Sequence, residues 1–191
     1  MVNGSTDEFF PITAHMATFD AIGGTDKRTS IAGNFDHGCY ALTGGKSAQT
    51  IADRATVRAN GGQRMWFGHW FGTSSDYTYV PVAPTVTLQA AGRSRCSRRS
   101  STMGASLDFK EVKIWWSNDD AFLWGNVALS PAGAGVYSGL VAFPLQANTA
   151  SFVDVLYETK QLIGAEEFSI SSPPSLPAGF VPHVRNIQTC L

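Results

Sequence analysis

Charged residues are scarce in this sequence, and the charges that it has nearly cancel. They make up 15% of its 191 residues, and 14 Lys and Arg stand against 15 Asp and Glu, which gives a net charge of -1. A balance so close to zero offers no global attraction to nucleic acid or to an anionic membrane. Any contact with such a partner has to come from a local group of residues.

Long apolar runs are missing as well. The longest ones, such as residues 139–145, fall far short of the roughly 20 residues that a membrane-spanning helix needs. The first fifteen residues also lack the basic and apolar segments of a secretory signal. We therefore expect a soluble protein with no membrane partner and no such signal in this chain.

Cysteine occurs only as Cys39, Cys96 and Cys190, which are far apart in the sequence. None of them lies in a CxxC pair of the kind that binds zinc or acts in redox chemistry. An odd number of scattered cysteines argues against a disulfide scaffold. It favours free thiols in a protein made in a reducing compartment over a structural bridge.

Catalytic motifs are absent too. The sequence has no G-x-S-x-G elbow, no Walker loop, no GxGxxG after a strand and no H-E-x-x-H. Its four histidines are scattered, and we assign no metal site to them. The chain is therefore expected not to be an enzyme, with no catalytic residue and no firm cofactor.

What the sequence has in quantity are glycine, proline and aromatic residues, a mixture that suits short strands joined by many turns. From residue 63 onward the apolar residues recur with a period near two, which is typical of strands. The alternation is clearest where Val153, Val155 and Tyr157 share one face and Asp154 and Glu158 the other. The predicted strands are RMWFGHWFG, YTYVPV, TVTLQAAG, LDFKEVKIWW, FLWGNVAL, GVYSGLVAFPL and ASFVDVLYETKQL.

This pattern predicts a single all-β domain, either a β-sandwich or a jelly roll, with residues 46–168 as its core. One convincing helix opens that core: Ser47 can cap it, residues 48–59 are good helix formers, and Gly61 and Gly62 end it.

Two extended segments are expected to flank the core. Residues 1–45 have no sustained period and are predicted to be an extended N-terminal arm or first strand. Residues 169–191 hold four prolines and are predicted to be an extended C-terminal tail. Such segments either lie on neighbouring subunits or form disordered ends.

Two adjacent carboxylates in SNDDAF, Asp119 and Asp120, are the candidate metal ligands, and calcium is the ion that such groups suit. Neighbouring residues of a strand point to opposite faces, so the two carboxylates converge only in a turn. The side chains of Asn118 and Asp119 favour a turn by themselves, because they can accept hydrogen bonds from the backbone. We interpret the stretch as a turn and keep calcium binding as the alternative.

The sharpest local charge is in RSRCSRR, which contains Arg93, Arg95, Arg98 and Arg99. Each guanidinium offers a forked set of donors that suits the phosphates of RNA. Because small polar residues flank the segment, we expect an exposed loop. Its charges either pair with acidic residues of this or a neighbouring subunit, or contact RNA.

The five tryptophans lie in two aromatic stretches. Trp66 and Trp70 belong to MWFGHWFG, and Trp115, Trp116 and Trp124 belong to KIWWSNDDAFLW. Aromatic faces can serve as a platform for bases or sugars, but such runs more often belong to a core. We expect these residues to anchor the core or a contact between subunits, because a small chain has little room to bury them all.

Three stretches, taken in order, resemble the single-jelly-roll capsid proteins of picorna-like viruses. In that family a helix leads into a strand with an F-x-x-W-R-G-S segment and then alternating aromatics. Here residues 48–59 lead into FGHWFGT at 67–73 and YTYV at 77–80, with Phe71 in place of the family's arginine.

The second stretch is VKIWWS at 112–117, which is similar to the family's V-x-V-P-Y-Y-S without its proline. The third begins with the V-x-V of Val153 to Val155. It continues with GAEEF at 164–168, where the family has a G-E-D-F turn, and ends with Pro173 and Pro174. The resemblance spans roughly residues 48–177.

The resemblance implies an eight-stranded antiparallel jelly roll with one or two short helices and extended terminal arms. It implies a structural subunit that assembles with copies of itself or with sister capsid proteins into an icosahedral shell around an RNA genome. The expected partners are other capsid subunits, genomic RNA and a host receptor, and the expected location is the virion, assembled in the host cell cytoplasm.

Two alternatives come from other classes of protein. The first is a carbohydrate-binding β-sandwich module, with Trp and Tyr on a concave face and Asp119 or Asp120 holding calcium. The second is a hydrolase built on a jelly-roll core, which would depend on one Ser, His or Asp residue.

Overall fold

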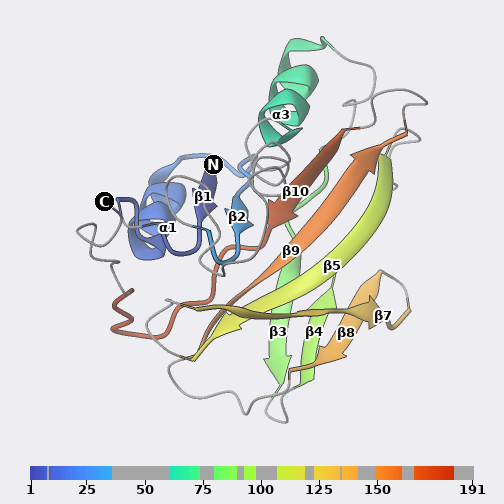
Figure 1. The fold of residues 1–191 in the computed structure, drawn as a ribbon. Coiled ribbons are helices and arrows are strands. Elements are labelled where there is room, and N and C mark those ends of the chain that lie inside the picture. The colour runs from blue at the N-terminus through green and yellow to red at the C-terminus, as the bar shows by residue number, and fades with distance from the viewer. Residues whose placement is uncertain are drawn as a thin grey trace, which may run out of the picture.

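Short strands dominate the part of the chain that the structure describes. The computed structural model describes residues 1–7, 9–35, 61–73, 80–89, 93–97, 107–118, 123–133, 135–141, 149–160 and 166–182. These residues form a mostly β structure with two short helices, α1 (Ile12–Ala21) and α3 (Gly62–Phe71) (Figure 1). The strands are β1 (Val2–Gly4), β2 (Ser30–Ala32), β3 (Thr85–Gln89), β4 (Arg93–Ser97), β5 (Leu107–Ser117), β6 (Gly125–Ala128), β7 (Ser130–Pro131), β8 (Val136–Leu140), β9 (Ala150–Thr159) and β10 (Glu167–Ser171).

The strands form two four-stranded antiparallel sheets and one parallel pair. The central sheet has the order β10-β9-β5-β6, the outer sheet has the order β3-β4-β8-β7, and β1 pairs with β2. Leu129 alone separates β6 from β7, and its N–H donates to the carbonyl of Val112 at 2.9 Å. The chain therefore passes from the central to the outer sheet in one run (Figure 1).

The order of four successive strands is that of a Greek key. β5, the β6–β7 run and β8 follow one another as neighbours, and β9 then returns to pair with β5. Their spatial order is β9, β5, β6–β7, β8. A fourth strand that lies beside the first is the defining feature of the Greek key.

The main core lies between the central and outer sheets. Val153, Val155 and Tyr157 of β9 are buried in it, as their alternation predicted, and Tyr137 of the outer sheet packs against them. Met65 of α3 reaches the same core. One side of the central sheet is thus covered by a second sheet and a helix.

A β-bulge in β5 keeps its apolar side chains on this core. The register with β9 shifts between Phe109 and Glu111. Leu107 and Phe109 lie before the bulge and Val112 lies after it, yet all three contact the main core. Because alternate residues of a strand point to opposite faces, one extra residue is needed to bring both halves onto one face. That residue is Lys110, which is exposed.

The N-terminal residues cover part of the opposite face of the central sheet. Ile12 of α1 and Ile31 of β2 pack with Trp115 and Phe152 in a second core. Gly33 approaches the ring of Trp115 so closely that a Cβ would overlap it. The second core therefore joins the start of the chain to the middle of the central sheet.

The prediction of an extended N-terminal arm is wrong for residues 12–21, which form α1. Ile12, His15, Met16 and Phe19 are the buried residues of this helix. They recur at intervals of three and four residues, so they form one stripe of a helix. The described N-terminal residues contact their own chain.

The C-terminal residues pack on the same face. The backbones of Ser151 and Ser175 exchange two hydrogen bonds of 2.7 and 3.0 Å, and Leu176 and Phe180 pack against the second core. β10 extends to Ser171, so the expected boundary between core and tail falls inside a strand. The prolines exclude regular structure only beyond that point.

Buried hydroxyl groups join β2 to β10. The hydroxyls of Ser30 and Ser169 are 2.6 Å apart, and the backbone N–H of Ile31 donates to Ser171 Oγ at 2.8 Å. Ser171 Oγ in turn donates to Asp154 Oδ1 at 2.7 Å. Because buried polar groups are costly without partners, this network fixes the N-terminal residues against the sheet.

Replacing Gly33 with alanine is expected to lower the free energy of unfolding by about 1 to 3 kcal/mol, because the methyl group would overlap Trp115 in a packed core. Urea denaturation measures this change. The matched control is Gly23→Ala, since a Cβ at Gly23 would meet nothing within 4 Å. Equal stability of the two variants would mean that residue 33 does not lie against Trp115.

Acid is expected to destabilise the fold through His15, which is buried with its Nε2 2.8 Å from Thr29 Oγ1. Burial is the main cause that lowers the pKa of His15 from 6.5 to about 4. The unfolded chain takes up this proton near pH 6.5, so the stabilisation is present above pH 6.5 and is lost as the pH falls towards 4.

His15→Gln keeps an amide that can bond to Thr29 but removes the titration. The variant should therefore show a flatter dependence of the urea midpoint on pH between 4 and 6.5. The same slope in both proteins would show that another group causes the acid sensitivity.

Candidate functional site

The most aromatic element, α3, is a helix, so the prediction of a strand for RMWFGHWFG is wrong. Trp66 and Trp70 lie with ring centroids 6.0 Å apart, and Phe67 and Phe71 with centroids 5.9 Å apart. Each pair is four residues apart, the spacing at which side chains meet on a helix. Gly72, with φ of 61°, ends the helix in the left-handed conformation that glycine adopts without strain.

The helix has one buried face and one exposed aromatic face. Met65 and Gly68 are buried against the rest of the chain. Phe67, Trp70 and Phe71, which we name the aromatic face, are 53%, 56% and 72% exposed. Exposed apolar groups of this size mark interaction sites more often than isolated exposed residues do.

The other tryptophans lie inside the described fold. Trp115 and Trp116 are neighbours on β5 and point to opposite faces, so Trp116 is in the main core and Trp115 is in the second core. Trp124 is buried beside Phe152, with ring centroids 5.2 Å apart. Of the five expected anchors, Trp66 is half-buried and Trp70 is 56% exposed.

The arginine-rich segment is not an exposed loop over residues 93–97, where the structure has strand β4. The alternation of RSRCS fits a strand of period two, and hydrogen bonds from β3 and β8 complete it on both sides. Arg93 and Arg95 are therefore two residues apart on one strand. Arg98 and Arg99 lie outside the described residues.

The register of β4 places its two arginines on one face of the outer sheet. Arg93 is opposite Leu140 of β8. Cys96, which belongs to the other set of alternating positions on β4, is opposite Tyr137. Leu140 is 65% exposed, and Tyr137 packs against the main core. Arg93 and Arg95 thus pair with Leu140 and Ser138 of β8.

Asp119 and Asp120, the candidate calcium ligands, lie outside the described residues. Asn118 precedes them, and its Oδ1 accepts a hydrogen bond from Thr149 Oγ1 at 2.6 Å. Within the described part of the chain, no group of three or more His, Cys, Asp and Glu residues is placed to hold a metal ion. The calcium alternative therefore stays a prediction.

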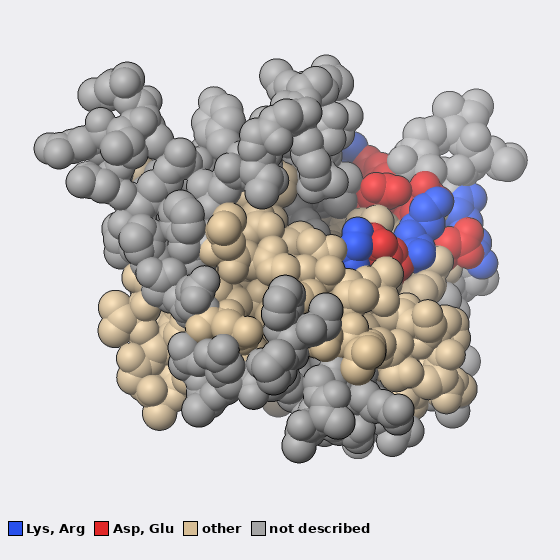
Figure 2. Space-filling view, turned by 60° about the horizontal axis from the view of Figure 1, so that its bottom comes forward, with Lys and Arg blue, Asp and Glu red and all other residues tan. Residues whose placement is uncertain are grey.

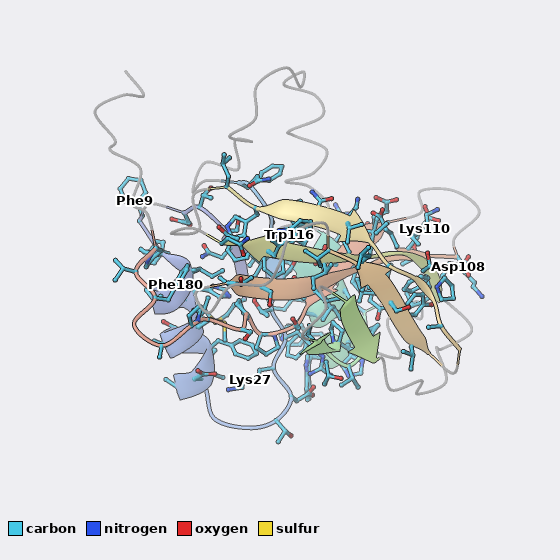
Figure 3. All side chains as sticks on the ribbon, turned by 90° about the horizontal axis from the view of Figure 1, so that it is seen from below. Phe9, Lys27, Asp108, Lys110, Trp116 and Phe180 are labelled. Carbon is cyan, nitrogen blue, oxygen red and sulfur yellow. The ribbon has the colours of Figure 1, made fainter. Side chains whose placement is uncertain are left out.

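Charged side chains gather at the end of the central sheet that the terminal residues leave uncovered. Figure 2 shows blue and red side chains mixed within one region of the surface, and Figure 3 places Asp108 and Lys110 far from Phe180. Three ion pairs hold this charged strip: Lys110–Glu158 at 2.7 Å, Lys113–Glu111 at 2.6 Å and Lys160–Asp108 at 3.3 Å. The hydrogen bond with Glu158 raises the pKa of Lys110. Because the strip is neutralised within the chain, it offers no net charge to a ligand.

A cavity of about 470 Å³ lies between α3, β10 and the segment that follows α1. Met65, Trp66 and Phe67 line it from α3, and Ile22 and Arg28 line it from the other side. Sequence reasoning missed this cavity, because its walls come from segments far apart in the chain and no local pattern marks them.

No family model, no curated protein and no solved structure matches this chain. Among the described helices, none combines the length and apolar character needed to cross a membrane. Any assignment of function must therefore rest on the geometry of the chain itself and on the motifs that resemble capsid proteins.

Replacing Gly72 with alanine should lower the free energy of unfolding by about 1 to 2 kcal/mol, because a side chain is strained in the left-handed conformation that ends α3. The paired variant is Gly62→Ala in the first turn, where a Cβ meets nothing within 4 Å. That variant should be neutral or more stable, since alanine has less freedom to lose on folding. Thermal and urea unfolding measure both. If both variants were equally stable, α3 would not end at residue 72.

Proposed function

We propose that this chain is a non-enzymatic structural subunit, which assembles with copies of itself or with sister capsid proteins into an icosahedral shell around an RNA genome. The observation that carries the proposal is the aromatic face of α3, made of Phe67, Trp70 and Phe71. Covering such residues with a neighbouring subunit removes a large apolar area from water. Symmetric shells are held by many repeated contacts of this kind.

The strand arrangement supports a jelly roll as the finer description of the fold. A jelly roll has eight strands in two sheets and contains two Greek keys. With β6 and β7 counted as the one run that they form, the described strands β3 to β10 make seven strands in two sheets, one fewer than a jelly roll has, and they contain the order of one Greek key. On this basis we extend the proposal to a jelly roll.

The second stretch that resembles capsid proteins lies in a strand, whereas the third lies only partly in strands, with Glu167 and Phe168 in β10 where the family has a turn. VKIWWS is in β5, and the third stretch begins in β9 and reaches Pro173 and Pro174 just after β10. The first stretch differs, because FGHWFGT is in α3 and the two residues after it, where the family has a strand. The proposal therefore depends more on the second half of the chain.

The proposal includes a contact of Arg93 and Arg95 with RNA or with a neighbouring subunit, and the alternation of the two residues on β4 supports it. In this proposal the protein is located in the virion, assembles in the host cell cytoplasm and meets a host receptor with its outer surface. Two guanidinium groups on one strand would bind phosphates in a salt-dependent way.

The double variant Trp70→Ser and Phe71→Ser tests the assembly contact. The unchanged chain is expected to form particles of one size in negative-stain images and in light scattering after size exclusion. The variant should shift to monomers or small oligomers, because it removes two exposed rings from the contact. Phe10→Ser is the control, since Phe10 is 60% exposed but is not part of α3, and its particles should persist.

Three results would contradict the proposal. An unchanged chain that stays monomeric at every concentration does not build a shell. Binding to a glycan array that Trp70→Ser abolishes would instead identify a carbohydrate-binding module, in which the same aromatic face stacks on sugar rings. Hydrolytic activity that a single Ser, His or Asp substitution removes would identify an enzyme.

A further inference from the structure

The cavity beside α3 has the size and the fixed walls of a small-molecule site. Its volume of about 470 Å³ falls within the roughly 300 to 1,000 Å³ of such sites. One wall is α3, and the opposite walls are the start of the chain and the segment between α1 and β2 (Figure 1). The backbone N–H of Ser171 donates to Thr29 at 2.8 Å, so β2 and β10 hold these walls together.

The walls that face the cavity are largely apolar. Met65, Trp66 and Phe67 contribute side chains from the first two turns of α3, and Ile22 and Ile170 contribute them from the other segments. Several polar lining groups are already bonded within the protein, such as the hydroxyls of Ser30 and Ser169 at 2.6 Å. A ligand that fills this space therefore needs an apolar body.

Lys27, one of the two cationic residues that line the cavity, is used inside the protein. Its Nζ donates to the carbonyls of Phe19 at 2.6 Å and of Ile22 at 3.2 Å, and it lies 4.7 Å from the centre of the Phe19 ring. Those carbonyls lie at the end of α1, where a cation is favoured by the helix dipole. Lys27 therefore stabilises the wall and is not available to a ligand.

Arg28 is the cationic side chain that remains for a ligand, beside the α-ammonium group of Met1, which donates to the Arg28 carbonyl at 2.7 Å. Its Nε donates to the Pro81 carbonyl at 2.7 Å and its Nη1 to the Lys27 carbonyl at 2.9 Å, while Asp26 Oδ1 is 3.4 Å from Nη1. Among the described residues no acceptor is bonded to Nη2. Three contacts thus fix a guanidinium at the cavity and leave one amino group for an anionic partner, with which charged hydrogen bonds are strong.

We propose that this cavity binds a small amphipathic anion, whose apolar body packs between Ile22 and the α3 side chains and whose single carboxylate binds Arg28. The charges of the lining side chains support an anion, since Lys27 and Arg28 stand against Asp26 alone. The residues that line the cavity all lie within one chain, so binding can be measured without shell assembly.

Isothermal titration calorimetry with three probes of one chain length tests this proposal. Decanoate, decanol and decyltrimethylammonium, each below its micelle concentration, share the apolar body and differ in charge. Decanoate should bind about tenfold more tightly than decanol, and the cationic probe should bind least. In Arg28→Gln the affinity for decanoate should fall to that for decanol. Equal affinity for the three probes, or no binding of any, would overturn the proposal.

A second variant tests whether the probe binds in the cavity. Gly62 lines the cavity, and a Cβ there meets nothing within 4 Å, so Gly62→Leu adds a side chain at the cavity wall. It should weaken the binding of both decanoate and decanol by about tenfold or more. Gly23→Leu is the matched control, because Gly23 also faces open space but does not line the cavity. Urea denaturation verifies that both variants fold.

Trp70→Ser separates the cavity from the aromatic face, since Trp70 belongs to that face and does not line the cavity. Decanoate binding should be unchanged in this variant. If Trp70→Ser removed the binding and Gly62→Leu did not, the probes would bind the exposed aromatic residues, and the cavity proposal would be wrong.

Discussion

The pairing of β5 with β9 is the constraint on which the rest of the described structure depends. The two strands pair from Leu107 with Thr159 to Ser117 with Ala150, interrupted only by the bulge. Ile114 and Val153 are opposite each other in the main core, whereas Trp115 and Phe152 stack in the second core with centroids 6.1 Å apart. A strand pair that is apolar on both faces cannot stay in water on either side. The elements around the β5–β9 pair therefore pack on one or the other of its two faces.

The coverage of that pair explains where the charges and the terminal residues are. On the side of the main core, the outer sheet and α3 cover the pair along its length. On the other side, the described terminal residues cover the end around Trp115 and Phe152, and the charged strip lies at the other end. The bulge at Lys110 makes this division possible, because it turns apolar residues inward and charged residues outward on both of its sides.

The sequence could predict the strands whose two faces differ. β5 and β9 alternate clearly enough to be located, and the residues of β9 that face the core could be named in advance. The pattern of α3 was ambiguous, because aromatic residues four apart fit both a strand of period two and a helix of period near four. α1 was missed because Gly23 and Gly24, which are typical of a turn, follow it closely. β4 was missed because a run of arginines and serines is typical of a solvated loop.

The candidate sites depend on contacts that a local pattern does not contain. The exposure of Trp70 and the burial of Trp115 follow from which elements cover α3 and β5, not from the residues next to them. The cavity depends even more on tertiary structure, since Arg28 acquires its position from the carbonyls of Lys27 and Pro81. Such contacts between distant segments become visible only once the strands are paired.

α3 connects the two proposals through one residue. Phe67 belongs to the aromatic face and also lines the cavity. If a neighbouring subunit covers the aromatic face, it restricts the rotamers of Phe67 and so changes one wall of the cavity. Thermodynamic linkage then requires that an anion in the cavity and a subunit on α3 alter each other's affinity by the same factor. A ligand of the single chain would in this way become a regulator of assembly, with its effect transmitted over one turn of helix.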